Sequence, residues 1–404
     1  MNTHYVKGNS IFNKINPCIK QYPYLTENID TDVIIVGGGV TGALLSYYFS
    51  TNGINSVVLE KGRIAHCSTG VTTSLLQYEL DSNANELSKY TPLNNVSRSY
   101  ELCIKALNEI HQFVSDYGNH CDYVPSSNLL YTSNKSDARE LVIEYNFRLD
   151  NNLPVKLITP ENNPYSFHVE AGIYAIDGGI QLDPYKYTHS LLDVASSNGA
   201  RIYENTQVVD IEYLDNSVIA HTVYGYKVSG KKIIAATGFN TSLFTDRAFG
   251  TKTTTFNIAT LPIDNLDSLY KGLNIRDNKD PYNYIRSTID NRLIIGGEDI
   301  NFIPDINNED LCNKKYSILE QRLKDLFPQY PIDIEYRYCG AFASTQDNLG
   351  FVGPDPKHNN LWYCLGYGAN GILFAILGAI MLTQLYKGET PNNIDLFKVD
   401  RFDN

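Results

Sequence analysis

The chain of 404 residues has few cysteines and no long apolar segment, and each shortage excludes certain classes of protein. It has seven cysteines, an odd number, and no two of them form a C-x-x-C pair. This pattern argues against a disulfide framework or a zinc site and favours a reducing compartment such as the cytoplasm. The first 31 residues hold no apolar stretch of signal-peptide length. The longest apolar run, Ile372 to Leu382, holds 11 residues, whereas a membrane helix needs about 20. We therefore expect a soluble cytoplasmic protein with no metal site and no transmembrane segment.

Basic residues are also scarce relative to acidic ones. Lys and Arg number 33 against 45 Asp and Glu, so the formal net charge at pH 7 is −12. Nucleic acid and anionic membranes are therefore not expected partners, because both attract basic proteins. A hydrophobic fraction of 43% with a charged fraction of 19% is typical of a folded chain, and the length predicts two or three domains.

The first strong pattern is a strand, a helix and a second strand near the N-terminus. Asp32 to Val36 is a continuous apolar run, as in buried parallel strands. A helix is predicted from Val40 to Asn52, with Gly53 as its stop, and a second buried strand from Ser56 to Glu60. This βαβ order predicts a parallel sheet with a right-handed crossover.

The rest of the chain mixes helical and strand patterns. Residues 83–153 read as mainly helical, and further helices are predicted over Pro184–Gly199, Asn308–Leu326 and Ile372–Tyr386. Strands are predicted at Gln207–Leu214, Val218–Tyr224, Lys231–Ala236 and Leu361–Leu365, with several more over 252–300 that include a hairpin through Asp290-Asn291.

Gly37-Gly38-Gly39-Val40-Thr41-Gly42 matches G-x-G-x-x-G at the junction of the first strand and helix. Gly37 allows the tight turn, Gly39 lets a pyrophosphate approach the backbone, and Gly42 lets the helix pack closely. The phosphates then lie at the positive end of the helix that begins near Val40 and Thr41. Glu60 ends the second strand, where its carboxylate can accept ribose hydroxyls; Lys61 beside it weakens the exclusion of a 2′-phosphate. The context predicts dinucleotide binding.

A second match to the same pattern lies at Gly366–Gly371, again between a predicted strand and a helix. No further strand carrying an acid follows it, so it is not a second complete nucleotide unit. This disfavours an NAD(P)H reductase with two such units. A glycine-rich helix N-terminus can still stabilise the negative charge of a reduced flavin.

Taken together, the motifs resemble those of the D-amino-acid oxidase, glycine oxidase and sarcosine oxidase family of FAD enzymes. The matching segments are Thr31–Gly42, Glu60-Lys61-Gly62, Ala235-Ala-Thr-Gly238, Arg292–Glu298, Ser344-Thr345-x-Asp347 and the Gly366–Gly371 turn. The resemblance implies an α/β fold, with a Rossmann-like FAD-binding domain of the glutathione-reductase type and a second, mixed-sheet substrate domain that roofs the flavin. The expected ranges are an N-terminal extension at 1–30, an FAD domain at 31–90, 170–245 and 335–404, and a substrate domain at 91–169 and 246–334.

The resemblance also implies which residues contact FAD. The Ala-Thr-Gly turn and the C-terminal glycine turn lie by the flavin in the family, and a stretch of small residues corresponding to Ser68–Ser74 packs against it. The predicted FAD-binding residues are Gly37, Gly39, Val40, Thr41, Gly42, Glu60, Lys61, Ser68, Thr69, Thr73, Val208, Thr237, Gly238, Gly368, Asn370, Gly371 and Ile372.

The chain departs from the family at the substrate anchors. Phe342 stands where glycine oxidases carry a carboxylate-binding Arg, Ala369 where they carry a second one, and Leu373 where sarcosine oxidases use a Lys. A carboxylate left unpaired in a dry pocket is costly. Either another Arg binds the substrate, or the substrate is not a simple amino acid.

Four residues are candidates for substrate chemistry. Arg286, with Tyr284 on the same strand face, can bind an anionic substrate, or it is a surface residue of a hairpin. Asn370 and Gln346 can offer hydrogen bonds at the flavin or substrate. Cys339 lies within one position of the place where sarcosine oxidases attach FAD covalently, although the offset does not match cleanly and a buried Cys often only packs.

These patterns predict an FAD-dependent oxidoreductase that oxidises a small amine or amino acid by hydride transfer to flavin. Oxygen or another acceptor then takes the electrons. Two alternatives stay open: a dehydrogenase of a hydroxy acid or polyol with a non-oxygen acceptor, and a flavin-binding subunit without a substrate of its own.

Overall fold

The computed structural model describes residues 6–304 and 306–403, which divide into two compact units. The first unit comprises 6–15, 71–183, 252–304 and 306–342, and the second comprises 16–70, 184–251 and 343–403. Residues 71–90 and 170–183, which are expected in the FAD-binding domain, lie in the first unit. The reason is that β5 and β8 pair with each other within the first unit's sheet. The assignment of FAD and substrate to these units stays a prediction.

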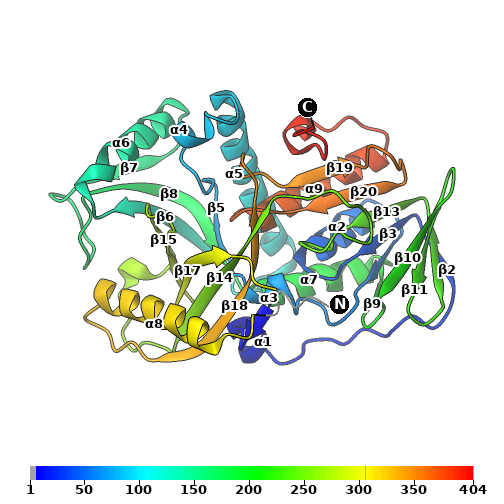
Figure 1. Ribbon diagram of the computed structural model, residues 1–404, viewed down its shortest axis with the longest axis horizontal. Helices are drawn as coiled ribbons and strands as arrows, with labels where there is room; N and C mark the ends of the chain where they lie inside the picture. Colours follow the sequence, from blue (N-terminus) through cyan, green and yellow to red (C-terminus); the bar gives the residue numbers. More distant parts are fainter. Residues whose placement is uncertain (1–5, 305, 404) are drawn as a thin grey trace. The chain divides into compact units, whose positions relative to one another are not determined.

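The second unit contains a mostly parallel sheet flanked by helices (Figure 1). Its strand order is β19-β20-β13-β3-β4-β9, in which only the β19–β20 pair is antiparallel. A separate small sheet has the order β10-β11-β12-β2. The elements are β2 (Ile29–Asp30), β3 (Val33–Val36), α2 (Val40–Thr51), β4 (Ser56–Leu59), α3 (Ser68–Val71), α7 (Pro184–Ser197), β9 (Arg201–Tyr203), β10 (Val208–Tyr213), β11 (Val218–Thr222), β12 (Lys227–Gly230), β13 (Lys232–Ala235), β19 (Phe351–Pro354), β20 (Leu361–Leu365), α9 (Gly371–Tyr386) and a short 3₁₀ turn at Ile394–Phe397.

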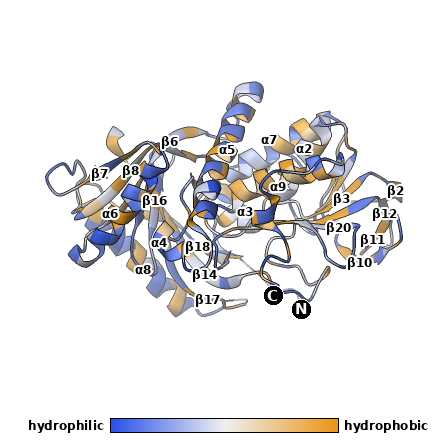
Figure 2. Ribbon diagram, turned by 90° about the horizontal axis from the view of Figure 1, so that it is seen from above, coloured by the Kyte–Doolittle hydropathy of each residue, from blue (hydrophilic) through white to orange (hydrophobic). Residues whose placement is uncertain are grey.

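The predicted βαβ unit is confirmed as β3, α2 and β4. β3 is buried along its whole length and is hydrophobic throughout, as Figure 2 shows. This fits a central strand of a parallel sheet that is covered on both faces. Helix α2 packs against α7 and α9 and ends at the C-cap Asn52, followed by Gly53 with a φ of +72°. The helix over 184–199 and the C-terminal strand and helix are confirmed as α7, β20 and α9.

The first unit is built on a large mixed sheet, with the order β1-β18-β14-β17-β16-β15-β6-β8-β5 and with β7 paired to β8. Its elements are β1 (Val6–Gly8), α1 (Ile11–Ile15), β5 (Leu75–Gln77), α4 (Ala84–Leu87), α5 (Leu93–Tyr117), β6 (Val124–Thr132), α6 (Lys135–Asp150), β7 (Val155–Ile158), β8 (Ala171–Gln181), β14 (Thr251–Thr260), a 3₁₀ turn at Ser268–Tyr270, β15 (Leu273–Asp277), β16 (Tyr284–Ser287), β17 (Leu293–Asn301), α8 (Glu309–Leu326) and β18 (Ile334–Ser344).

Helix α8 packs on this sheet, and its buried residues recur every three or four positions on an otherwise mostly hydrophilic helix (Figure 2). Its buried Tyr316, Leu319 and Leu323 join a cluster with Phe256 and Ile295 from the strands. The predicted hairpin is confirmed as β16 and β17, with Asn291 at a φ of +64° in the turn. The helical pattern over 83–153 holds for α4, α5 and α6 but missed β6, whose short apolar run looks the same in a helix or a strand.

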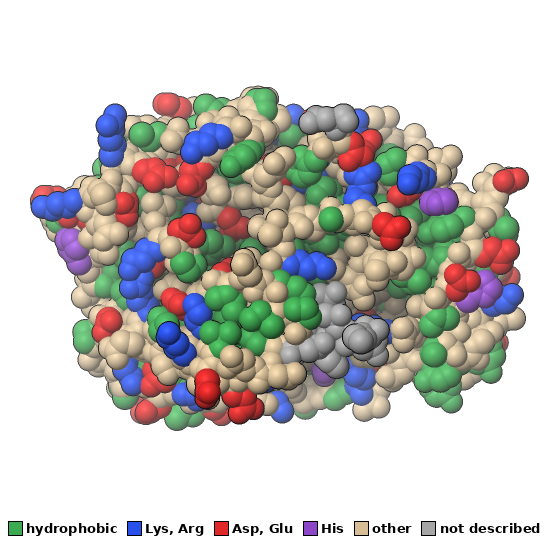
Figure 3. All heavy atoms as spheres, in the orientation of Figure 1, with side chains coloured by type: hydrophobic (Ala, Val, Ile, Leu, Met, Phe, Trp, Pro, Cys, Tyr) green, Lys and Arg blue, Asp and Glu red, His purple; other side chains and the backbone are tan. Residues whose placement is uncertain are grey.

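Two surface features bear on partners. On the face in Figure 3, acidic and basic side chains are interspersed. Across the described residues, no helix combines the length and apolar character needed to cross a membrane.

Candidate functional site

The Gly37–Gly42 turn joins β3 to α2, and its glycines are required for different reasons. Gly37 has a φ of +117°, and a Cβ on Gly42 would lie 1.9 Å from the Gly37 carbonyl oxygen. Helix α2 can therefore meet the strand only with glycine at 42. A Cβ on Gly39 would meet Thr69 Oγ1 at 3.0 Å and nothing else within 4 Å. Of the three glycines, Gly39 has the most free space beside its Cα, which fits a backbone that a pyrophosphate approaches.

Glu60 follows β4, and its carboxylate is tied to the same turn. Its oxygens accept the N–H of Gly38 at 2.7 Å and the N–H of Gly62 at 2.8 Å. Burial raises the pKa of Glu60, although these two hydrogen bonds pull it down. Because each carboxylate oxygen has two acceptor positions, ribose hydroxyls can still bind, as the predicted role requires.

The C-terminal Gly366–Gly371 turn repeats this packing. A Cβ on Gly366 would lie 2.0 Å from the Gly371 carbonyl oxygen, so β20 and α9 also meet through glycine. The Tyr367 hydroxyl donates to the Gly238 carbonyl at 3.0 Å. The structure thus brings together the two turns that the family resemblance places by the flavin. Near them, Thr237 Oγ1 is buried with no hydrogen-bond partner in the described chain, which fits a ligand at this point.

The remaining predicted cofactor residues of the second unit differ in their surroundings. Thr69 Oγ1 accepts the N–H of Val40 at 3.0 Å, a bond that fixes α3 against the start of α2. Asn370 is 2% exposed and forms the N-cap of α9. Val208 lies in an apolar cluster, whereas Lys61 is exposed. Gln346, a candidate for substrate chemistry, is exposed as well.

Arg286 lies on β16 in the first unit and is only 4% exposed. Its N–H groups donate to the carbonyl oxygens of Leu182 at 2.9 Å, Ser287 at 3.2 Å and Thr73. Burial lowers the pKa of Arg286 to about 10, so it remains charged at neutral pH. An anionic substrate would have to compete with three carbonyl groups for this side chain. Thr73, predicted to bind FAD, offers its carbonyl to Arg286.

Tyr284 shares the face of Arg286, and its hydroxyl lies 3.1 Å from Thr255 Oγ1. Its ring lies 5.7 Å from that of Tyr282, centroid to centroid. Burial raises the pKa of Tyr284 well above its ordinary value, which keeps the phenol neutral. Sequence reasoning found Tyr284 but not Thr255, which only the strand pairing brings next to it.

The three places that carry substrate anchors in the family hold apolar residues here. Phe342 is half-buried at the end of β18, Ala369 lies in the C-terminal turn, and Leu373 is buried in α9. These side chains offer neither a charge nor a hydrogen bond to a carboxylate.

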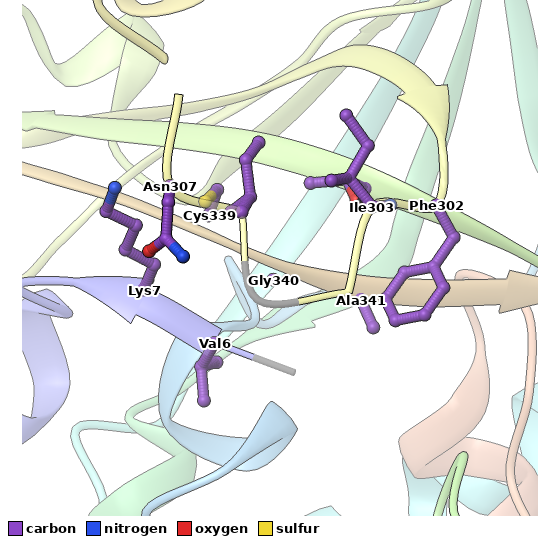
Figure 4. Close-up of a pocket in the computed structure, with 10 residues that line it drawn as sticks. Val6, Lys7, Phe302, Ile303, Asn307, Cys339, Gly340 and Ala341 are labelled. Carbon is purple, nitrogen blue, oxygen red and sulfur yellow. Dashed lines mark hydrogen bonds between the residues drawn. The ribbon is translucent and has the colours of Figure 1, made fainter. Parts of the chain in front are cut away.

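Cys339 lines a cavity of about 440 Å³ in the first unit (Figure 4). The cavity is formed by β1, β14, β18 and the segment after β17, and Lys7 and Asn307 bring polar groups to it. Burial raises the pKa of Cys339 to about 11, so the thiol is protonated and a weak nucleophile. Covalent FAD attachment at Cys339 stays an untested prediction.

The parallel sheet, its glycine turn and Glu60 define a dinucleotide-binding protein of the α/β class. A family model described as FAD dependent oxidoreductase, DAO, matches residues 32–385. The chain belongs to this family, and its cofactor is FAD. The resemblance noted from the motifs is thereby confirmed.

Individual relatives align with most of the chain at low identity. A putative Rieske 2Fe-2S iron-sulfur protein of Bacillus subtilis is 22% identical over 411 residues, which cover 99% of this chain and 77% of that protein. A gamma-glutamylputrescine oxidoreductase of Escherichia coli is 24% identical over 375 residues, which cover 90% and 85%. The crystal structure of glycine oxidase from Geobacillus kaustophilus superimposes with a TM-score of 0.78 at 20% identity, covering 92% of this chain and 99% of that one. At this identity the likeness confirms the fold alone, an α/β architecture with a mixed-sheet part.

Proposed function

We propose that this FAD-dependent oxidoreductase oxidises the C–N bond of a small amine or amino acid. The observation that carries the proposal is the family match over residues 32–385. Glycine and γ-glutamylputrescine, named in two of the similar proteins, are both amino compounds, which favours a C–N over a C–O bond. Bound FAD supplies the acceptor for the hydride equivalent. The substrate loses two electrons and two hydrogens and becomes an imine, which water hydrolyses.

The chain's own residues orient the substrate in this proposal. The neutral phenol of Tyr284 offers a hydrogen bond, and the amides of Asn370 and Gln346 offer others. Asn370 begins α9, whose N-terminal N–H groups favour negative charge. Arg286 holds β16 to neighbouring segments through the carbonyls of Thr73 and Leu182, so we assign it to positioning Tyr284 rather than to binding an anion.

The acceptor and the location are further parts of the proposal. The Bacillus subtilis relative is named as an iron-sulfur protein, which supports an acceptor other than oxygen. The seven cysteines without a paired pattern support the cytoplasm, and the net charge of −12 supports a small-molecule substrate rather than nucleic acid.

Anaerobic reduction of the bound flavin tests the proposal. The purified holoprotein is mixed without oxygen with amines, amino acids, hydroxy acids and polyols, and dithionite serves as the control that the flavin can be reduced. We expect an amine or amino acid to bleach the flavin bands. Admission of oxygen then shows, by peroxide formation, whether oxygen is the acceptor. Bleaching by a hydroxy acid or polyol alone would contradict the proposal and favour a dehydrogenase of that class. A flavin that only dithionite reduces would point to a subunit without its own substrate.

A further inference from the structure

The large sheet of the first unit has one apolar face and one polar face. Phe256 on β14 and Ile295 on β17 join the cluster that packs on α8. Because side chains alternate along a strand, the next residues, Asn257 and Gly296, point to the opposite face. Gly296 is paired with Asn257 on one side and with Tyr284 on the other. These three residues therefore lie in a line across three strands of the polar face.

Because Gly296 has no side chain, the side chains of Asn257 and Tyr284 can occupy the space above it. A Cβ there would lie 2.3 Å from Asn257 Oδ1 and 2.3 Å from Tyr284 Cε2. The Tyr284 hydroxyl in turn lies 3.1 Å from Thr255 Oγ1, two residues before Asn257 on β14. Asn257, Tyr284 and Thr255 therefore lie near one another on this face, and a hydrogen bond joins the last two.

A β-bulge brings a carboxylate into the same series. Gly297 and Glu298 have φ values of +140° and +57°, and the pairing shifts from Phe256 with Gly297 to Thr254 with Ile300. The extra residue turns the following side chains over, so Asp299 shares the face of Thr255, which donates a hydrogen bond to it. We call the residues Asn257, Tyr284, Thr255 and Asp299 the polar row.

The charges around Asp299 leave it without a dedicated counterion. Lys315, the cation that acts on it, is ion-paired with Glu298 at 3.0 Å. The other nearby charges are the carboxylates of Asp81 and Glu298, and both repel it. Within the described residues, Asp299 Oδ1 is buried and has no hydrogen-bond partner. Burial raises the pKa of Asp299 to about 6, so it is ionised at neutral pH.

The hydroxyl and guanidinium groups around Asp81 have partners of their own. The Tyr282 hydroxyl donates to Asp81 Oδ1 at 2.9 Å. Arg276 lies beside them, but it donates to the backbone carbonyls of Leu80 at 3.0 Å and Asp81 at 2.8 Å. Tyr282, Tyr284, Asp81 and Asp299 are each partly exposed, whereas the other end of the polar row is buried.

Buried polar groups at the other end indicate a ligand independently of the charges. Asn257 is 1% exposed, and neither its Nδ2 nor its Oδ1 has a hydrogen-bond partner in the part of the chain that the structure describes. The same holds for the hydroxyl of Tyr338, which is 0% exposed and close enough to Tyr284 to act on it electrostatically. Buried polar atoms are nearly always hydrogen-bonded. Asn257 within the polar row and Tyr338 near Tyr284 therefore point to a polar ligand that hydrogen-bonds to them.

We propose that the polar row binds the ammonium group at the non-reacting end of a cationic amine, with Asp299 as its counterion. This inference rests on the proposed amine oxidation and names its substrate class, a diamine or an amine with a second basic group. The reacting amine must be neutral to give up its electrons, so the cation held here is a second group. Two carboxylates, at Asp81 and Asp299, disfavour an anion at the same place.

A pair of four-carbon probes tests the polar row. Putrescine and butylamine differ by one ammonium group, and their binding to the holoprotein is measured by anaerobic calorimetry together with KM for flavin reduction. We expect Asp299→Asn to weaken putrescine binding at least about tenfold, the usual size of a lost charge-assisted contact, and to leave butylamine within about twofold. The matched control Asp264→Asn removes an exposed carboxylate of the same unit and should change neither.

A second variant distinguishes a specific loss of binding from a folding defect. Thr255→Val keeps the shape but removes the hydrogen bond to Asp299, and we expect a smaller loss that is again confined to putrescine. Wild-type protein that binds butylamine as tightly as putrescine would overturn the inference, as would an equal loss of both probes in Asp299→Asn. Calorimetry needs no turnover, so it tests the polar row even if no amine reduces the flavin. Failure to reduce the flavin would count against the proposed function alone.

Discussion

Single glycines in the second unit determine how closely its backbone segments approach. A methyl group on Gly42 would lie 1.9 Å from the Gly37 carbonyl oxygen, which is backbone and cannot move aside cheaply. We expect Gly42→Ala to push α2 away from β3, to cost about 1–3 kcal/mol as overpacking usually does, and to lower FAD content severalfold. The flavin-to-protein absorbance ratio and the thermal midpoint measure both effects. Gly62→Ala is the control, because its Cβ would lie 3.7 Å from Glu60 Oε1; equal losses in the two variants would contradict the steric account.

A single residue, Asp299, should also make the binding of putrescine depend on pH. Its pKa is raised from 3.8 to about 6, chiefly by burial, with Asp81 and Glu298 acting in the same direction and Thr255 and Lys315 against them. The carboxylate is neutralised as the pH falls through about 6, so we expect the KM for putrescine to rise there while that for butylamine does not follow it.

The raised pKa of Asp299 also makes the stability of the fold depend on pH, and here the ionised form is the unfavourable one. The folded state holds the proton more tightly than the unfolded chain, so ionised Asp299 destabilises the fold above about pH 6, and this cost disappears as the pH falls toward 3.8. Asp299→Asn should therefore be at least as stable as wild type at neutral pH. A putrescine KM that is flat across this range would contradict the assignment.

Among the elements, α6 is joined to α4 and to the segment that follows β5 by a buried ion network. Arg148 is 0% exposed and donates to Glu144 at 2.8 Å and to Glu79 at 3.3 Å, while Glu144 also accepts the N–H of Ala84 at 2.7 Å. Arg148→Met leaves two buried carboxylates without their cation, and we expect a loss of about 3–5 kcal/mol in the free energy of unfolding. Urea denaturation measures it. The triple variant with Glu79→Gln and Glu144→Gln should recover much of the loss, and a triple variant no better than Arg148→Met would refute the electrostatic cause.

Helix α7 carries a buried histidine that makes the second unit sensitive to acid. His189 is 2% exposed, and burial lowers its pKa from 6.5 to about 4, although Glu204 and Asp193 oppose the shift. The unfolded chain binds the proton more readily, so stability is complete above about pH 6.5 and is lost as the pH falls toward 4. We expect His189→Phe to reduce this loss by up to about 3 kcal/mol. Urea denaturation at neutral and mildly acidic pH compares the two, and parallel pH profiles would contradict the prediction.

Elements fixed by local patterns were predictable from the sequence, and those fixed by pairing were not. β3, α2 and β4 follow from apolar runs and glycines within about thirty residues, whereas β6 needed its partners β8 and β15 to be distinguished from a helix.

Arg286 and Tyr284 were placed on one strand face correctly. Asp299, Thr255 and Asn257 were missed, because their convergence depends on the register of β14 with β17 and on the bulge after Gly296. The Gly296-Gly297 pair was the one local sign of that bulge.

For the molecule as a whole, the family and the cofactor followed from an ordered set of motifs, while the assignment of FAD and substrate to parts of the chain stays a prediction. The expected ranges followed the family outline, but β5 and β8 pair within the large sheet and carry residues 71–90 and 170–183 into the first unit. Of the residues proposed to contact FAD, Gly42 is the one that the variants above replace.

The visible spectrum of the purified protein tests the central claim most directly, with the identity of any released cofactor determined chromatographically. The account predicts flavin absorption bands from FAD, either as isolated or after reconstitution, and their loss on anaerobic addition of an amine. A protein that shows no flavin bands even after incubation with FAD would contradict the account and would reduce the Gly37–Gly42 turn to a purely structural feature.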